Sequence, residues 1–287
     1  MTAPLNRRAG HRPEWLKIRI PGDLDRLPVS RLMNDLALNT VCQEARCPNI
    51  FECWAAGTAT FMILGEICTR RCTFCAVGKG KPLLADPDEP RRVAEAVEKM
   101  RVKHVVITMV NRDDMPDGGA EHVAKTVLAV RERTGAAVEV LISDLEGNRD
   151  ALQIVLGAKP EVLAHNVETV PRLYPAVRPV AKYRRSLDVL RWAHDAGAMT
   201  KSSLMLGLGE SEDEILATAR DLREAGVDIF TMGQYLAPTG NHHPVRRYWT
   251  PEEFTSLGEQ ARALGFHHVE SAPLVRSSYM AHRALHP

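Results

Sequence analysis

The stretch FMILGEICTRRCTFCAVGKGKP, residues 61–82, joins a short apolar run to three cysteines, Cys68, Cys72 and Cys75, spaced C-x3-C-x2-C. The run FMILG (61–65) is typical of a buried strand. The cysteine segment is charged and runs into glycines and a proline, which is typical of a loop. A helix carrying the three cysteines on one face fits their i, i+4, i+7 spacing but not this composition. Because three thiolates can hold an iron–sulfur cluster and leave one iron open, we expect a reaction centre in this loop.

The other three cysteines, Cys42, Cys47 and Cys53, lie upstream with the spacing C-x4-C-x5-C and complete the chain's supply. This second triad predicts a second cluster. A disulfide framework is disfavoured, because 287 residues can bury a core without cross-links and the N-terminal sequence has no apolar secretory segment. Zinc is a stronger alternative, but a structural zinc site usually closes with four ligands and each group here is a triple.

Apolar strand-like runs alternate with amphipathic helical patterns along most of the chain. We predict strands at 61–65, 104–110, 137–143, 161–167, 199–207 and 227–233, and helices within 27–41 and at 88–101, 119–135, 148–157, 184–196, 211–225 and 251–264. Such alternation indicates parallel β/α packing in one domain. We expect a barrel or an open α/β sheet whose strand C-termini carry the site.

Polar residues gather directly after several predicted strands, which favours a single shared pocket. They are Thr108, Asn111, Arg112, Asp113, Asp114, Ser143, Asp144, His165, Asn166, Glu168, Gln234 and Tyr235. Aspartates after strands also cap helices, so the sequence leaves capping and site roles open for Asp113, Asp114 and Asp117.

Composition excludes several classes of partner. The chain is 45% apolar and 25% charged, and its formal charge of +1 gives no general attraction to nucleic acid or acidic membrane surfaces. No apolar stretch approaches the length of a membrane span. Paired arginines such as Arg70-Arg71 and Arg184-Arg185 are interpreted mainly as solvated surface or local anion contacts.

The C-x3-C-x2-C loop after the first strand of a β/α series resembles the radical S-adenosylmethionine (SAM) superfamily. The upstream triad, RSSY (276–279) and the blocks VNRDDMPDGGAEH, LAHNVETVPRLYPAVRP, YRRSLDVL and KSSLMLGLGE resemble its lipoyl synthase family over nearly the full chain. The resemblance implies an α/β fold, a partial (β/α)6-type TIM barrel over residues 58–270. It also implies an N-terminal extension (1–57) with the auxiliary cysteines and a C-terminal segment (271–287) with RSSY, both covering the barrel mouth.

The same resemblance implies the chemistry. Cys68, Cys72 and Cys75 would bind a [4Fe–4S] cluster that cleaves SAM to a 5′-deoxyadenosyl radical. Cys42, Cys47 and Cys53 would bind an auxiliary [4Fe–4S] cluster that donates sulfur, with Ser278 as its fourth ligand. Two sulfur atoms would enter at carbons 6 and 8 of an octanoyl chain on a carrier lysine, with two SAM molecules used per lipoyl group. From the residues alone, Ser277 and Ser278 could equally begin a helix.

Further calls follow from matching blocks of the family. Implied SAM contacts are Thr108, Asn111, Asn166, Glu168, Arg184 and Lys201. Implied partners are octanoylated lipoyl carrier domains, as in 2-oxoacid dehydrogenases and the glycine cleavage H protein, an electron donor such as flavodoxin or ferredoxin, and an iron–sulfur carrier that repairs the auxiliary cluster. The short N-terminus without transit-peptide character predicts a cytoplasmic protein. Two alternatives stay open, a radical SAM sulfur or methyl transferase similar to biotin synthase and a non-catalytic zinc protein.

Overall fold

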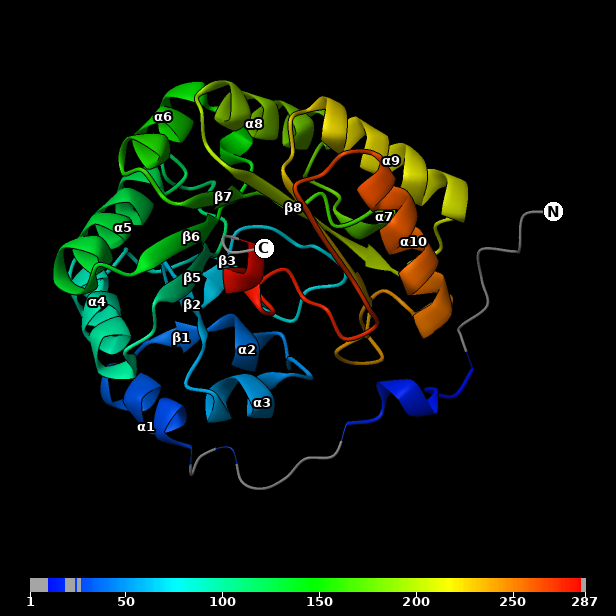
Figure 1. The fold of residues 1–287 in the computed structure, drawn as a ribbon. Coiled ribbons are helices and arrows are strands. Elements are labelled where there is room, and N and C mark those ends of the chain that lie inside the picture. The colour runs from blue at the N-terminus through cyan, green and yellow to red at the C-terminus, as the bar shows by residue number, and fades with distance from the viewer. Residues whose placement is uncertain (1–9, 19–23, 25–26, 285–287) are drawn as a thin grey trace.

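One curved, mostly parallel sheet organises the chain, and helices cover its outer face (Figure 1). The computed structural model describes residues 10–18, 24 and 27–284. The sheet order is β1-β2-β5-β6-β7-β8-β9-β10. Its strands are β1 (Asn39–Thr40), β2 (Thr60–Ile63), β5 (His104–Met109), β6 (Ala137–Leu141), β7 (Val162–Ala164), β8 (Thr200–Leu206), β9 (Ile229–Gln234) and β10 (His268–Ser271). β1 runs antiparallel to β2, and the other neighbouring pairs are parallel.

The six strands predicted from apolar runs are all present, because strands covered on both faces need continuous apolar sequence. β7 is shorter than its predicted range of 161–167. After Ala164 the chain leaves the sheet and rejoins it only at an isolated bridge between Glu168 and Leu204. β10 was not predicted, because HVES is short and half polar.

The helices between the strands match the predicted ranges within a few residues. They are α4 (Glu89–Met100), α5 (Ala120–Thr134), α6 (Arg149–Gly157), α8 (Tyr183–Asp195), α9 (Glu212–Glu224) and α10 (Pro251–Ala263). Ser211 and Thr250 begin α9 and α10 with capping boxes, each completed by a glutamate three residues later. The apolar faces of these helices pack on the sheet in two large buried clusters, so the sheet's inner face is left for the site.

Shorter elements stand at the inner face and at the chain ends. They are η1 (Glu14–Leu16), α1 (Pro28–Asp35), α2 (Val41–Glu44), α3 (Ile50–Ala55), η3 (Leu145–Gly147), η4 (Pro171–Leu173), α7 (Tyr174–Val177) and η5 (Ala281–Ala284). Only α1 among them was predicted. Within the second cysteine segment, β3 (Ile67–Cys68) and β4 (Gly78–Lys79) form a separate parallel pair.

The sheet is open, because no ladder joins its edge strands β1 and β10 in the part of the chain that the structure describes. After β10 the chain crosses the inner side of the sheet (Figure 1). Ala284 then packs against Val162 and Ile229, near the N-terminal ends of β7 and β9. The expected partial, open β/α architecture is thus confirmed. Among the helices described here, none has the length and apolar character that crossing a bilayer requires.

Candidate functional site

A single cavity of about 840 Å³ lies where the strands end on the inner side of the sheet. Its lining combines residues after β5, β6, β7 and β9 with the cysteine loop, the α2–α3 region and the C-terminal segment. This volume falls in the range of small-molecule and cofactor sites. The cavity therefore lies where the strand-end rule predicts a site.

The three cysteines of the second segment all face this cavity. Cys68, Cys72 and Cys75 line it and are each partly exposed. Cys68 ends the short strand β3, and the other two follow in a loop, so the helical alternative is excluded. Backbone N–H groups of Arg70 and Asn111 each donate to Cys68 Sγ at 3.4 Å.

Partial burial changes the pKa values of two thiols in this triad, Cys72 and Cys75. Desolvation raises the pKa of Cys75 to about 12 although the Val77 backbone N–H lowers it, and desolvation also raises the pKa of Cys72 against the opposing charge of Arg178. Thiolates are the form that binds iron. The positive charge of bound iron would offset the cost of ionising these two partly buried thiols.

The upstream triad is built from two short helices and the turn between them. Cys42 lies in α2, Cys53 lies in α3, and Cys47 lies between the two. Cys42 and Cys47 line the cavity. Burial raises the pKa of Cys53 to about 12, with the charges of Cys42 and Cys47 adding to the rise, so the three sulfurs interact electrostatically.

Ser278 lies on the lining of the same cavity. Two hydrogen bonds hold its segment to the upstream triad. Asn49 Nδ2 donates to Leu274 O at 2.8 Å, and Tyr279 Oη donates to Glu52 Oε1 at 3.0 Å. Because Asn49 and Glu52 lie between Cys47 and Cys53 in sequence, these bonds hold the segment that contains Ser278 against the region of the upstream triad.

Four of the predicted SAM contacts come together on the lining, namely Thr108, Asn111, Asn166 and Glu168. Asn111 Nδ2 and Asn166 Oδ1 are buried without a hydrogen-bond partner among the described residues. Burial raises the pKa of Glu168, although the charge of Arg178 and a bond from Asn166 lower it. Buried polar atoms left unpaired are costly, so these two atoms can serve as hydrogen-bond partners of a polar ligand.

The other two predicted SAM contacts lie away from the cavity. Lys201 is the second residue of β8, and its Nζ donates to both carboxylate oxygens of Glu139 at 2.8 and 3.1 Å. Its side chain is only 2% exposed. Arg184 is exposed in the first turn of α8. Neither residue is on the cavity lining.

Arg178 is a lining residue that the sequence analysis missed. It is buried, and its Nη1 donates to the carbonyls of Asn166 and Val167 at 2.8 and 3.2 Å and to Tyr174 Oη at 3.1 Å. Its Nε has no partner in the described chain. Its position in the block YPAVRP, an arginine within a mostly apolar turn, was the available signal.

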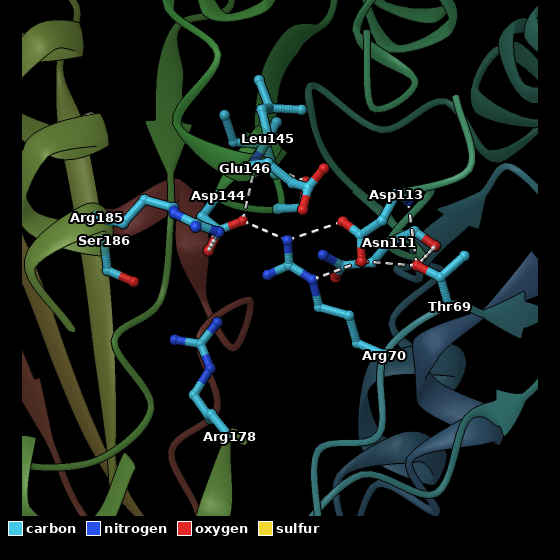
Figure 2. Close-up of polar contacts among 12 residues, drawn as sticks. Thr69, Arg70, Asn111, Asp113, Asp144, Leu145, Glu146, Arg178, Arg185 and Ser186 are labelled. Atoms are coloured by element: carbon cyan, nitrogen blue, oxygen red, sulfur yellow. Dashed lines mark hydrogen bonds and ion pairs between the residues drawn. The ribbon is translucent and has the colours of Figure 1, made fainter. Parts of the chain in front are cut away.

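The paired arginines were interpreted as solvated surface or local anion contacts, and Arg70 makes local anion contacts while being buried. Its side chain is 3% exposed and bonds both Asp113 and Asp144 (Figure 2). Arg71 is exposed, as expected.

The three aspartates for which the sequence left capping and site roles open have different partners. Asp113 bonds Arg70, Asp114 pairs with Arg112, and Asp117 accepts backbone N–H groups at the start of α5. Asp117 therefore caps a helix, while Asp113 and Asp114 form ion pairs with arginines.

The donor sets fit iron–sulfur clusters. Each triad presents three sulfurs from separate backbone positions, and five of the six cysteines line the cavity together with Ser278. Within the described ranges, no three His, Cys, Asp or Glu side chains converge closely enough to hold a single metal ion. Cluster binding places each thiolate on a different iron, so the ligands need not converge on a point.

Comparisons with known proteins agree with this geometry. The model of the Radical SAM superfamily matches residues 62–222. Lipoyl synthase of Rubrobacter xylanophilus is 59% identical over 274 residues, covering 94% of this chain and 85% of the relative. Lipoyl synthase of Chloroflexus aggregans is 54% identical over 274 residues, covering 94% of this chain and 90% of the relative.

Solved structures show the same fold. Streptococcus suis SuiB bound to S-adenosylmethionine has a TM-score of 0.57 at 13% identity, covering 77% of this chain and 51% of that one. Methylornithine synthase has a TM-score of 0.53 at 13% identity, covering 88% of this chain and 84% of that one. At such low identity these two matches support the fold alone.

Proposed function

The chain belongs to the radical SAM superfamily and, within it, to the lipoyl synthase family, and we propose how its residues divide the work of that activity. The family reaction inserts sulfur at carbons 6 and 8 of an octanoyl chain bound to a lysine of a lipoyl carrier protein. Membership implies a [4Fe–4S] cluster and SAM. It excludes the alternative of a non-catalytic zinc protein.

The observation that carries the proposal is the shared cavity. Residues of both cysteine groups, Ser278 and unpaired polar atoms after β5 and β7 all line one space. A substrate chain entering it would therefore meet a SAM site and a sulfur source without leaving the cavity.

We assign the radical cluster to Cys68, Cys72 and Cys75, which lie beside the strand ends. When bound, this cluster supplies the electron that splits SAM and so makes an unactivated C–H bond breakable. The residues around it bind and orient SAM. Arg178 would pair with the carboxylate of SAM, because its guanidinium charge is buried and no carboxylate side chain among the described residues bonds to it.

The amide and carboxylate groups nearby complete the proposed SAM site. Asn111 and Asn166 each offer an unpaired polar atom, and Glu168 can accept from the amino group. Thr108 Oγ1 donates to Leu141 O at 3.1 Å, so its lone pairs remain as acceptors. Apolar lining residues such as Met205 exclude water around the octanoyl chain.

We assign the auxiliary cluster to Cys42, Cys47, Cys53 and Ser278. The Asn49 and Glu52 bonds support this assignment, because they hold the Ser278 segment from both sides. An oxygen ligand is harder than a thiolate, so it would be more easily released when the cluster gives up sulfur.

The proposed partners are octanoylated carriers of the 2-oxoacid dehydrogenases and the glycine cleavage system. A flavodoxin or ferredoxin would deliver electrons, and an iron–sulfur carrier would rebuild the auxiliary cluster. The cytoplasm is the proposed location. These assignments rest on the family and on the sequence.

The test is anaerobic turnover with an octanoylated carrier domain, excess SAM and a reductant. We expect 5′-deoxyadenosine and a carrier in which two sulfur atoms replace two hydrogens, read by mass spectrometry. Replacing Cys42, Cys47 and Cys53 with alanine should leave 5′-deoxyadenosine formation and abolish sulfur insertion. Lipoyl product from that variant would refute the auxiliary assignment, and SAM cleavage by a Cys68/Cys72/Cys75→Ala variant would refute the radical-site assignment.

A further inference from the structure

Arg70 stands between two of the proposed radical-cluster cysteines yet points away from solvent into a carboxylate pair (Figure 2). Its Nε and Nη2 each donate to Asp113 at 2.8 Å, and Nη2 also donates to Asp144 Oδ1 at 2.6 Å. Asp113 follows β5 and Asp144 follows β6. One side chain thus ties the cysteine loop to the ends of two neighbouring strands.

The carboxylates are themselves held in place. Asp144 is fully buried, accepts from the Glu146 backbone N–H at 3.1 Å and lies 3.4 Å from Arg185 Nη1. A fork of this kind fixes the guanidinium plane as well as its position. The loop is therefore anchored to rigid parts of the fold.

A second set of contacts carries this anchoring to Cys68. Thr69 Oγ1 donates to Asp113 Oδ2 at 3.0 Å, and its backbone N–H donates to Asn111 O at 3.1 Å. The two backbone N–H groups that donate to Cys68 Sγ belong to residues in this network. Arg70 follows Thr69 in sequence, and Asn111 accepts the Thr69 N–H through its carbonyl. Hydrogen bonds to cluster sulfurs and the partners behind cluster ligands tune the site and its affinity for metal.

We infer that Arg70 is a positioning residue, whose fork to Asp113 and Asp144 holds the Cys68–Cys75 loop in its cluster-binding shape. The inference rests on the proposed function, because it takes this triad as the radical-cluster site. In this role Arg70 binds neither SAM nor iron. Its role is to fix the loop and the two N–H groups aimed at Cys68.

The chain offers a matched control in Arg112. Its side chain is also 3% exposed, and it forks onto Asp114 with two bonds of 2.9 Å. Its further bond goes to Leu64 O rather than to the cysteine loop. A lysine at either position keeps the charge and loses the two parallel hydrogen bonds. Comparing the two variants therefore separates loop anchoring from the general effect of replacing a buried arginine.

The experiment measures iron release from the reconstituted full-length protein under an anaerobic chelator. The radical site is identified by the electron paramagnetic resonance signal that changes when SAM is added. We expect Arg70→Lys to lose that site's iron about tenfold faster than wild type or more. Hydrogen exchange of the segment 69–76 should rise in the same variant. Arg112→Lys should match wild type in both readouts.

Equal iron release by Arg70→Lys and wild type would overturn the inference, as would release by Arg112→Lys as fast as by Arg70→Lys. Should Arg70→Lys fail to fold, Asp144→Asn removes one side of the fork and should give an intermediate rate. A wild-type rate for that variant would also overturn it. A wild-type protein without any SAM-sensitive signal would instead contradict the proposed function.

Discussion

Replacing Lys201 with methionine separates a structural role from the SAM contact that its sequence block implies. Its Nζ lies 2.8 and 3.1 Å from the two carboxylate oxygens of Glu139, and the two side chains are 2% and 1% exposed. His104 Nε2 lies 3.7 Å from the same carboxylate. The substitution would leave Glu139 buried without its cation. Breaking a buried pair in this way costs about 3–5 kcal/mol of folding free energy.

The pH dependence of this loss has a definite sign. In the wild type, burial raises the pKa of Glu139, but the charge of Lys201 and the nearby His104 outweigh this effect, so the pKa is lowered overall. This pair stabilises the fold at pH values above the pKa that Glu139 has in the unfolded state. The stabilisation is lost as pH falls through the lower pKa that Glu139 has in the folded state. Without Lys201 the folded pKa should rise instead, so the variant should recover stability as pH is lowered from 8 to about 5.

The assay is chemical denaturation of the reconstituted protein at two pH values, with SAM affinity measured alongside. A Glu139→Leu/Lys201→Met double variant is the control and should regain most of the lost stability. We expect unchanged SAM affinity in both folded variants. Wild-type stability combined with lost SAM binding in Lys201→Met would refute the structural role.

Three further predictions concern the C-terminal segment and acid stability. A Cβ at Gly233 would collide with Val275 O, so Gly233→Ala should displace the RSSY segment, costing about 1–3 kcal/mol in chemical denaturation; wild-type stability would contradict this. Tyr279→Phe removes the bond to Glu52 and should release auxiliary iron about tenfold faster while SAM cleavage continues, and unchanged iron retention would count against the tie. Burial lowers the pKa of His165 to about 4, so its contribution to the free energy of unfolding should fall by roughly 3 kcal/mol as pH drops from 6.5 to 4. If a His165→Gln variant loses stability with falling pH as wild type does, this prediction is wrong.

Most of the fold could be predicted because its long elements have clear periodicity. β5 reads as a continuous apolar run and α9 carries its capping box in the sequence. α2, α3 and β10 were missed, because elements of four to six residues are fixed by tertiary contacts and not by their own pattern.

The site was predictable where spacing or strand ends fix it. Cysteine spacing indicated both triads, and the strand-end rule gathered Asn111 and Asn166. The predicted strand 199–207 already placed Lys201 near its N-terminal end, but Lys201 was chosen as a SAM contact from a family block, and the structure places it away from the cavity. The sequence left Arg70 open between solvated surface and a local anion contact, because its partner Asp144 lies 74 residues away and only the folded chain brings them together.

The most direct measurement for the two-cluster account is anaerobic iron, acid-labile sulfide and zinc content, compared between wild type and a Cys68/Cys72/Cys75→Ala variant. We predict about eight irons and eight sulfides per chain in wild type and about four of each in the variant, because each triad holds one [4Fe–4S] cluster. Zinc without iron in the wild type, or loss of all iron in the variant, would contradict two independent cluster sites on one cavity.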